Sequence, residues 1–290
     1  MNPEEYVARL ERIAVGDATW SRQKSVFRRI IRSFYREHGR AFPWRNIKNP
    51  YRILVSEVML QQTQTSRVLE RYPMFLRQFP TVKALARAPL QEVLSLWEGM
   101  GYYRRARNLH ASAQTICADW NGRVPRTAEG LRTLPGIGEY TAAAVSAFAF
   151  NISVPMIETN IRSVYLHTFF QDKLDVQDSE IMNLIQETMD CANPRDWFYA
   201  LMDVGVVIKR LYPSINKSSR HYSRQSPYVG SSRELAAKIL RSVVGESSGT
   251  SIESLSRILQ VESHRIQEQV ARLVKDRLLH VSERGIIRCL

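Results

Sequence analysis

A glycine-containing turn and the carboxylate that follows it are the residues of this sequence best suited to chemistry. The turn lies within residues 134–142, and Glu158 follows sixteen residues after that stretch. Glycines allow a tight turn and a close approach to a partner, which leaves the first amides of the next helix open to an anion such as a DNA phosphate. A carboxylate at a fixed distance beyond the turn would lie beside the sugar of the held nucleotide, where positive charge develops when a glycosidic bond breaks.

Glu57 is a second carboxylate, and it lies on the apolar face of a predicted helix. The helical spacing of positions 53, 57 and 60 places it on one face with Ile53 and Leu60. Burial on that face would disfavour the ionised form and raise the pKa of the side chain, which makes a Glu a proton donor near neutral pH. The alternative is a Glu at the edge of the face that pairs with Arg52 or Arg105.

Three glutamines, Gln61, Gln62 and Gln64, follow Glu57, and the same spacing extends the face of Glu57 to Gln64. They form either a polar helix end or a set of long neutral amides that wedge into a base stack and hydrogen-bond base edges while a nucleotide swings out. Residues 97–110 add a Gly-x-Gly turn, two tyrosines and three arginines, a tract that is suggestive only in combination with the rest.

The composition favours a polyanionic partner. The chain has 290 residues, enough for more than one domain, and 41 Lys plus Arg against 28 Asp plus Glu give a formal net charge of +13. The corresponding pI is near 9.9. We therefore expect DNA or RNA as the partner, with an ordinary basic soluble protein as the alternative.

The cysteine count argues against a disulfide framework or a four-thiolate metal site, because Cys117, Cys191 and Cys289 are too few and too scattered. The first twenty residues are rich in charge and have no apolar core of signal-peptide length, and no later run approaches the length of a membrane span. We expect reduced thiols, no metal site and a cytoplasmic protein without a membrane partner.

Apolar residues at helical spacing dominate from Gln23 to Leu211, whereas strand-like alternation is almost absent before the last dozen residues. This pattern predicts an all-α body with short connections at Pro and Gly residues. From Ser231 it changes to helices at 234–243, 252–259 and 263–278 and a hairpin of strands at 279–281 and 286–288. That order is typical of a winged helix, which often places its third helix in a DNA groove but also serves in dimerisation and docking.

Residues 204–233 contain no acidic residue, while six basic residues and three tyrosines are interleaved there. Such a stretch is either a solvated loop or a segment that follows a nucleic-acid backbone. We predict a first domain at 1–208, a basic linker at 209–230 and a winged-helix domain at 231–290.

In combination these segments resemble the helix-hairpin-helix (HhH-GPD) superfamily of DNA glycosylases and, within it, the MutY-like adenine glycosylases. The matching landmarks, in order, are 42–45, 49–51, 56–63, 79–81, 99–110, 134–141, Asn160 and 202–205. The resemblance covers about residues 27–208, far more than a lone turn motif supplies by chance. It implies an all-α, two-lobed helix-hairpin-helix glycosylase domain, with the N-terminal helix packed on the second lobe and the winged helix following.

The resemblance also implies roles for individual residues. Glu57 matches the general acid that protonates the purine, and Glu158 stands at the position of the catalytic Asp that stabilises the oxocarbenium-like sugar. Tyr140 and Asn160 match residues that position this chemistry. Tyr140 also stands where lyase-competent relatives carry a Lys, which disfavours Schiff-base chemistry and strand cleavage. A neutral acid and an ionised carboxylate would then divide the work of glycosidic cleavage.

Three features depart from the family pattern. Glu158 replaces Asp, and the extra methylene moves the carboxylate by about 1.5 Å, enough to weaken, retune or abolish activity. The four-cysteine iron–sulfur loop is missing, because Lys209 stands where its first Cys is expected, so we expect no cluster. The winged helix replaces the Nudix-like C-terminal domain that, in the family, reads 8-oxoguanine opposite the adenine.

We therefore predict a monofunctional DNA glycosylase, without AP lyase activity, that hydrolyses the N-glycosidic bond of a flipped-out mispaired base, adenine first, in base excision repair. We expect a nucleoid-associated monomer that acts on mismatched or damaged double-stranded DNA without a cofactor, although the resemblance admits a monovalent cation at the hairpin carbonyls. The alternatives are a mismatch glycosylase for thymine or uracil and a non-catalytic DNA-binding protein on a glycosylase scaffold. The expected DNA contacts are Trp44, Arg45, Gln61, Gln62, Thr63, Tyr103, Arg105, Gly136, Gly138, Lys217 and Arg220.

Overall fold

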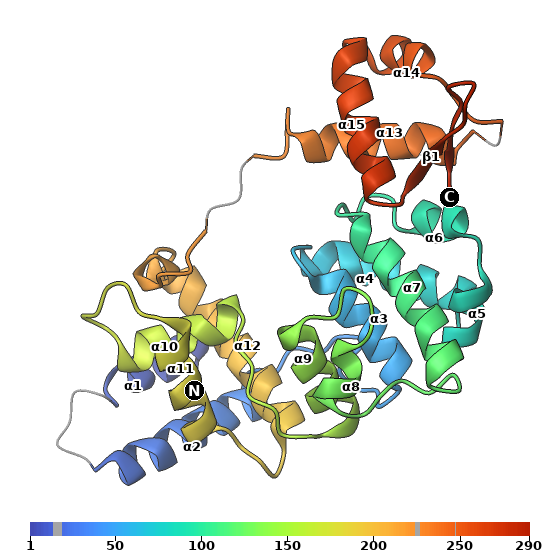
Figure 1. Cartoon of the computed structure of the whole chain (residues 1–290). Coiled ribbons are helices and arrows are strands. Elements are labelled where there is room, and N and C mark those ends of the chain that lie inside the picture. The colour runs from blue at the N-terminus through green and yellow to red at the C-terminus, as the bar shows by residue number, and fades with distance from the viewer. Residues whose placement is uncertain (14–18, 224–226, 247) are drawn as a thin grey trace. The chain divides into compact units, whose positions relative to one another are not determined.

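The computed structural model describes residues 1–13, 19–223, 227–246 and 248–290, and nearly all regular structure in these ranges is helical (Figure 1). The strands that it contains there form one small two-stranded sheet near the C-terminus. The prediction of an all-α fold is therefore confirmed. Within the same ranges, no helix is both long enough and apolar enough to cross a membrane.

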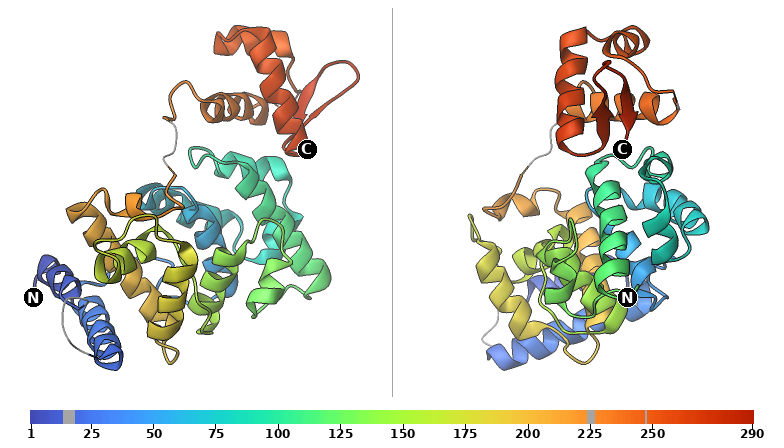
Figure 2. Two further views of the ribbon diagram at one scale, coloured as in Figure 1. Left: turned by 60° about the vertical axis from the view of Figure 1, so that its left-hand side comes forward. Right: turned by 45° about the vertical axis from the view of Figure 1, so that its right-hand side comes forward.

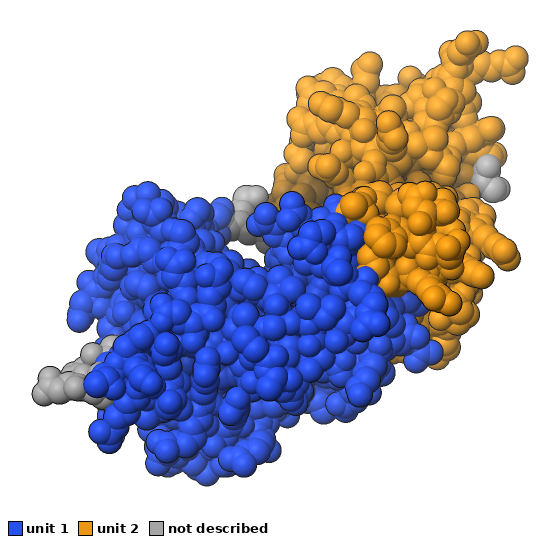
Figure 3. Space-filling model, turned by 60° about the horizontal axis from the view of Figure 1, so that its bottom comes forward, with its two compact units in different colours: residues 1–53, 126–132, 138–224 blue, residues 54–125, 133–137, 225–290 orange. Residues whose placement is uncertain are grey.

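The chain divides into two compact units, which Figure 3 colours separately. Unit 1 comprises Met1–Ile53, Arg126–Arg132 and Gly138–Arg224, and unit 2 comprises Leu54–Pro125, Thr133–Ile137 and Gln225–Leu290. Unit 1 contains α1 (Pro3–Glu11), α2 (Trp20–His38), α8 (Ala128–Arg132), α9 (Glu139–Phe150), α10 (Thr159–Phe169), α11 (Asp178–Thr188), α12 (Pro194–Leu211) and the 3-10 helix η1 (Ile215–Ser218). Unit 2 contains α4 (Thr65–Gln78), α5 (Val82–Arg87), α6 (Leu90–Leu96), α7 (Arg104–Asp119), α13 (Ser232–Val244), α14 (Ile252–Leu259), α15 (Ser263–Lys275), β1 (Leu279–Val281) and β2 (Ile287–Cys289). Helix α3 (Pro50–Leu60) begins in unit 1 and ends in unit 2.

The core of unit 1 is built from aromatic side chains of α2, α10 and α12. Phe27, at the centre of the apolar face of α2, has its ring centroid 5.5 Å from that of Tyr165 on α10 and 5.8 Å from that of Trp197 on α12. Helix α12 begins at Asn193, whose side chain caps the first turn, and Pro194 occupies its first position. Helix α1 packs on α2, α10 and α12. This packing fixes α10 against α12, and α10 carries the candidate site residues at its start.

The first part of unit 2 is organised around α7, which packs against α5 and α6. Helix α7 buries Ala106, Leu109, Ala113 and Ile116 at helical spacing. Trp97, directly after α6, is fully buried, and its ring packs edge-on against an aromatic ring of α4. The result is a small helical core that holds the second half of α3.

The C-terminal part of unit 2 shows the predicted order of three helices and a hairpin (Figure 2). The antiparallel strands β1 and β2 pair Leu279 with Cys289 and Val281 with Ile287, one residue later in the second strand than predicted. The prediction that the third helix reaches residue 278 was wrong. Helix α15 ends at Lys275, because Arg277 adopts a left-handed backbone with a φ of 52°. The winged-helix assignment and the domain boundaries stay predictions.

The segment predicted as a basic linker is partly ordered within unit 1. Helix α12 continues to Leu211, and η1 follows almost at once. The side chain of Asn216 in η1 donates to Ser163 Oγ of α10 at 2.9 Å, and the backbone of Val176 bridges to Ser219. These contacts tie residues 215–220 to unit 1, so this part of the stretch is not a solvated loop.

Candidate functional site

Glu57 is buried on α3, as its position on the apolar face predicts. The residue is 4% exposed, and its helix neighbours Ile53 and Val58 are equally buried. The guanidinium of Arg105, considered above as an ion-pair partner, instead donates to backbone carbonyls and to Thr63. The burial of Glu57 is therefore confirmed, and its role in catalysis stays a prediction.

Arg105 closes the C-terminal end of α3, whose last carbonyls lack partners within the helix. Its Nη1 donates to the carbonyl oxygens of Val58 and Met59, each at 2.9 Å. Its Nη2 donates to Thr63 Oγ1 at 2.8 Å and to the carbonyls of residues 100 and 101 at 3.0 and 3.1 Å. Burial lowers the pKa of Arg105 to about 10, which leaves it cationic at neutral pH. Arg105 thus positions the segment after α3 with donors that point into the protein.

The glutamines beyond α3 differ from the prediction made on helical spacing. Helix α3 ends at Leu60, and Gln62 adopts a left-handed backbone with a φ of 52°, which ends the helical repeat. Gln64 is the N-cap residue of α4 and does not share the face of Glu57. That prediction was wrong, because the spacing of i, i+3 and i+4 has meaning only while the helix continues. Gln61 is half-buried and Gln62 is exposed.

Four of the residues expected to contact DNA line one cavity of unit 2, which has a volume of about 470 Å³. These four are Gln61, Gln62, Tyr103 and Arg105. Helices α13 and α15 supply further lining, with Arg233 and Arg272 among apolar side chains such as Leu240 and Leu273. The structure therefore joins the segment after α3 to two arginines of the C-terminal region, a connection that no sequence pattern indicates.

Polar contacts hold the C-terminal helices against the rest of unit 2 at this cavity. Arg233 Nη1 donates to Tyr102 Oη at 2.6 Å, and Arg107 Nη1 donates to the carbonyl oxygen of Asp276 at 2.8 Å. Further contacts are the Arg241–Glu98 ion pair at 2.6 Å and the hydrogen bond from Gln91 to the carbonyl of Val244 at 2.9 Å. The C-terminal end of α15, the third helix of the predicted winged helix, therefore lies against α7.

Glycine occupies the two positions of the turn before α9 for different structural reasons. Gly136 has a φ of 75°, and a Cβ built on it would lie 2.3 Å from Asn108 Nδ2, so the fold itself requires glycine. Gly138 has a φ of −86° and no atom within 4 Å of its built Cβ. As the N-cap of α9 it offers no side chain to the first amides of the helix. Open space thus lies in front of a helix N-terminus, which suits an anion.

Glu158 is the N-cap residue of α10. Its Oε1 accepts a hydrogen bond from the backbone N–H of Ile161 at 2.8 Å, and its Oε2 accepts one from Asn160 Nδ2 at 3.1 Å. An acceptor at this position satisfies one of the otherwise unpaired amides at a helix start. The Oδ1 of Asn160 is buried and has no hydrogen-bond partner among the described residues. Glu158 and Asn160 are thus brought together as predicted, with one acceptor atom left unsatisfied beside the carboxyl group.

The carboxyl group of Glu158 is harder to ionise than that of an ordinary glutamate. Burial raises the pKa of its carboxyl group, and the N–H groups of Asn160 and Ile161 oppose this shift. The positive charges of Lys209 and Arg162 oppose it as well. Desolvation outweighs these favourable interactions, so the protein alone shifts Glu158 toward its neutral form.

Lys209 and Arg162 are the charged neighbours that the sequence analysis missed as parts of this site. Lys209 was noted only because it occupies the position of an absent cysteine. A useful signal was present, because Lys209 follows Gly205 by four residues and so shares its face of α12. Arg162 also pairs with Asp178, with Nη2 and Oδ2 at 2.6 Å.

Gly205 allows α12 to approach the start of α10 closely. A Cβ built on Gly205 would lie 2.2 Å from the carbonyl oxygen of Asn160 and 2.8 Å from its Cα. We therefore expect Gly205→Ala to lower the free energy of unfolding by about 1–3 kcal/mol, as overpacking does, and to displace Asn160 from Glu158. Urea denaturation of the variant checks this value. A substitution that leaves the unfolding midpoint unchanged would contradict the close approach.

Trp44 and Arg45, expected at the DNA, lie in the interior of unit 1. Arg45 Nη1 and Nη2 donate to the two carboxylate oxygens of Asp203 at 2.7 and 2.8 Å, and the Arg45 side chain is 5% exposed. The ring of Trp44 stacks on that of Phe42, with centroids 5.1 Å apart. The bidentate ion pair between Arg45 and Asp203 links residues that are distant in the sequence. The Arg45 and Trp44 side chains therefore both stabilise the fold of unit 1. Tyr140 is half-buried in the first turn of α9.

Lys217 and Arg220 lie on or next to η1, and both are exposed. Arg220 forms an ion pair with Asp175, which compensates much of its charge locally. Lys217 makes no ion pair within the described residues. Of these two expected DNA contacts, Lys217 therefore presents the more available charge. Arg224, another basic residue of this stretch, lies outside the described residues.

The described part of the chain holds no group of three or more His, Cys, Asp or Glu side chains suited to a metal ion. The three cysteines are free thiols. Cys191 is exposed, and Cys117 and Cys289 are half-buried.

Comparison with protein families matches residues 55–191 to the model described as "HhH-GPD superfamily base excision DNA repair protein". This segment belongs to the HhH-GPD superfamily. It contains Glu57, the segment after α3, the turn before α9, and the start of α10 with Glu158 and Asn160. The family named from sequence landmarks is confirmed.

Adenine DNA glycosylases are among the relatives that this chain resembles. The chain is 35% identical over 188 residues to that of Buchnera aphidicola subsp. Baizongia pistaciae, a match that covers 63% of this chain and 53% of the relative. It is 47% identical over 133 residues to that of Mycobacterium tuberculosis (strain CDC 1551 / Oshkosh), a match that covers 46% of this chain and 44% of the relative. The chain thus spans about half the length of the curated relatives it matches.

Solved structures support the same fold. A thermostable thymine-DNA glycosylase superposes with a TM-score of 0.58 and 26% identity, over 64% of this chain and 88% of that protein. A non-covalent endonuclease III–DNA complex superposes with a TM-score of 0.51 and 21% identity, over 71% of this chain and 90% of that protein, which bears on the fold alone.

Proposed function

We propose that this protein is a monofunctional DNA glycosylase that hydrolyses the N-glycosidic bond of a mispaired, flipped-out adenine in duplex DNA, as part of base excision repair. The observation that carries the proposal is the burial of Glu57 on α3 within the HhH-GPD segment, because burial disfavours the ionised form of a carboxyl group and so favours a proton donor. The 35–47% identity to adenine DNA glycosylases supports adenine as the base.

In the proposed reaction, Glu57 donates a proton to the purine, which makes the base a better leaving group. Glu158 stabilises the positive charge that develops on the sugar as the bond breaks. Asn160 holds Oε2 of Glu158, and its unsatisfied Oδ1 would accept a hydrogen bond from the attacking water. An approaching sugar cation would favour the ionised form of Glu158, against the desolvation that raises its pKa in the protein alone.

The reaction needs neither an amine nucleophile nor an iron–sulfur cluster. Tyr140 offers no amine at the turn, so we propose base release without AP lyase activity. The three cysteines of the sequence are fewer than the four thiolates that a cluster binds. We further propose that the protein acts as a monomer and that it is cytoplasmic and associated with the nucleoid.

We propose that DNA is held by the turn before α9 and by the cavity that Gln61 and Gln62 line. The glutamines would enter the base stack, and Arg233 and Arg272 of the C-terminal helices would contact the same DNA from the cavity wall. The +13 net charge supports such a partner. Lys217, in unit 1, is a separate proposed contact with a phosphate.

Gly138→Ala tests the grip of the turn on DNA. The built Cβ meets no protein atom within 4 Å and the φ of −86° suits any residue, so we expect an unchanged free energy of unfolding. The added methyl group would occupy the space that a phosphate needs, so affinity for a 20-base-pair duplex should fall at least severalfold. Fluorescence anisotropy measures the affinity. Unchanged binding by a stable variant would remove the turn from the DNA interface.

A panel of labelled duplexes tests the proposed activity. The panel holds A opposite G, A opposite 8-oxoguanine, T opposite G, U opposite G and fully paired DNA, each scored for abasic sites with and without alkali. We expect strand breaks from an A-containing mismatch only after alkali, because base release without lyase activity leaves the strand intact until treatment. Binding of all duplexes without base release would favour a non-catalytic DNA-binding protein.

A thymine mismatch glycosylase is the second candidate, and the likeness to the thymine-DNA glycosylase structure at 26% identity favours it. The buried Glu57 argues against it, because a pyrimidine has no N7 to accept the proton. Release of T opposite G, with A left in place, would establish this candidate over the first.

A further inference from the structure

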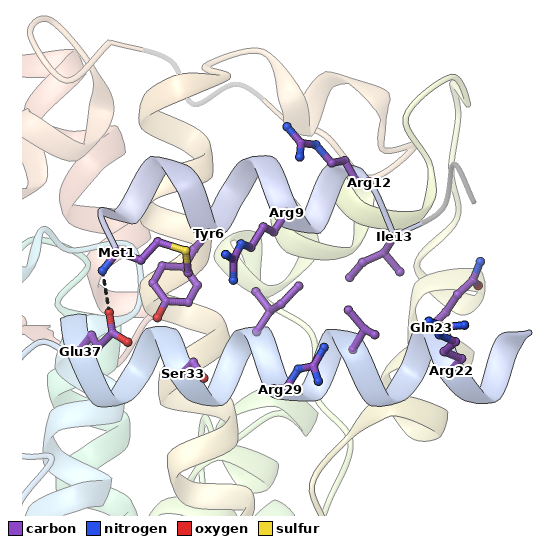
Figure 4. A pocket seen from close by; sticks show the side chains of 12 residues that line it. Met1, Tyr6, Arg9, Arg12, Ile13, Arg22, Gln23, Arg29, Ser33 and Glu37 are labelled. Carbon is purple, nitrogen blue, oxygen red and sulfur yellow. Dashed lines mark hydrogen bonds and ion pairs between the residues drawn. The ribbon is translucent and has the colours of Figure 1, made fainter. Parts of the chain in front are cut away.

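A cavity of about 690 Å³ lies between α1 and α2, within unit 1 and outside the segment that matches the HhH-GPD family (Figure 4). Its volume falls in the range of binding pockets for sizeable ligands. None of the candidate site residues lines it. The proposed glycosylase reaction therefore leaves this cavity without a role.

Four arginines line the cavity: Arg9 from α1, Arg12 directly after that helix, and Arg22 and Arg29 from α2. All four are exposed, and none has an ion pair or a hydrogen bond among the residues that the structure describes. Figure 4 shows Arg9 and Arg29 facing the space between the two helices. The one carboxylate that lines the cavity, Glu37, is paired with the N-terminal amine at 3.2 Å. Four arginines thus line the cavity, and the one carboxylate in its lining is already paired.

The floor of the same cavity is apolar. Tyr6 and Ile13 of the N-terminal segment and Val26 and Ile30 of α2 line it, and Val26 is the most exposed of the four. Like charges cost energy when they are held close together, and an apolar surface costs energy in water. A ligand that carries both an apolar face and flanking negative charges would relieve both costs at once.

From these observations we propose that the groove between α1 and α2 binds an acidic amphipathic helix of a partner protein. Two antiparallel helices present a hydrophobic groove into which a third helix can lay its apolar face, a common mode of helix recognition. The acidic side chains that flank that face would pair with the four arginines in the bidentate geometry that guanidinium and carboxylate favour.

Other occupants fit these features less well. A DNA backbone would satisfy the arginines but leave the apolar floor in water. Residues 14–18, which connect the two helices, contain a single acid, Asp17, which supplies one negative charge against four positive charges. Charge complementarity and the apolar floor together therefore select an acidic, amphipathic protein segment.

Binding of designed peptides to the full chain tests the proposal. The probe is a labelled 18-residue helical peptide with Leu on one face and Glu on both flanks, compared with a scrambled peptide of the same composition and with a Lys-for-Glu version. We expect binding of the acidic amphipathic peptide alone, in the micromolar range, by fluorescence anisotropy. Arg9→Glu combined with Arg29→Glu should weaken it at least tenfold, and Val26→Ser should weaken it severalfold, because the first removes charge and the second removes apolar contact.

The matched control is Arg77→Glu combined with Arg87→Glu, which changes the net charge equally at exposed sites that do not line the cavity. This control should retain peptide binding, and circular dichroism should show intact folding of every variant. Equal binding of the scrambled peptide, or no binding of any peptide, would overturn the proposal. So would loss of duplex DNA affinity in the groove variant with peptide binding intact, which would assign the arginines to DNA. These measurements do not depend on glycosylase activity.

Discussion

Replacing Glu57 by glutamine should abolish base release while DNA binding persists. The amide keeps the size and polarity of the side chain but has no proton to give to the departing base. The loss of a positioned general acid lowers a rate on the order of 10²–10⁴-fold. Single-turnover cleavage of the preferred duplex, followed by alkali, measures the rate, and anisotropy with the same duplex measures the affinity.

The control for Glu57→Gln is Glu70→Gln, the same chemical change on the exposed side of α4 in the same unit. Both variants should unfold at temperatures close to that of the native protein, because glutamine has nearly the same size and shape as glutamate. Full activity in Glu57→Gln would remove the proposed acid, whereas joint loss of activity and binding would point to a structural role for this carboxyl group.

Periodicity predicted the burial of Glu57 but not the end of its helix. The apolar spacing around Ile53 and Glu57 is a local property that a helix preserves, so the face could be assigned correctly. The break at Gln62 depends on a left-handed backbone that a glutamine rarely adopts. Arg105 closes that helix end through contacts with residues more than forty positions away, and no pattern in the sequence encodes such an arrangement.

The basic residues illustrate a second limit on what can be predicted from the sequence, namely which charges are available to a ligand. Arg45 and Arg105 were expected at the DNA, yet both are buried and direct their donors to protein acceptors. Composition reports how many charges a chain carries, and only tertiary structure shows which of them are compensated. The same reasoning brings attention to Arg9 and Arg29, which no motif marks and which line the cavity between α1 and α2 beside a carboxylate that is already paired.

Glu158 shows how one side chain can serve both a helix start and a reaction. The sequence indicated Glu158 by its position after the turn, and the structure adds that it caps α10 and contacts Asn160. The raised pKa of Glu158 was not predicted, because its desolvation depends on α12 packing over this helix start and so cannot be read from local sequence. The cap stabilises the helix, whereas the charge that catalysis needs is disfavoured in the protein alone.

Glu158→Gln should separate these two contributions. The amide oxygen can still accept from Ile161 N–H, so the helix cap persists, but the charge that stabilises the sugar cation is lost. We expect a loss of base release on the order of 10²–10³-fold. Because burial raises the pKa of Glu158, the folded protein holds this proton more tightly than the unfolded chain does. The free energy of unfolding of the native protein therefore falls as the pH rises from the pKa of an ordinary Glu through the raised pKa of Glu158. The Gln variant should lack the part of this fall that Glu158 causes.

At neutral pH, Glu158→Gln should thus be at least as stable as the native protein while it is nearly inactive, a combination that thermal denaturation and single-turnover kinetics can show on one preparation. Glu158→Asp is the matched comparison, because it keeps the charge and a good cap but withdraws the carboxylate by about 1.5 Å. Since both carboxyl oxygens of Glu158 are already engaged, we expect Asp to lower the rate as well. A faster Asp variant would mean that the site has lost part of its catalytic function through the presence of Glu158. A Gln variant that is destabilised but active would mean that the role of Glu158 is only to cap α10.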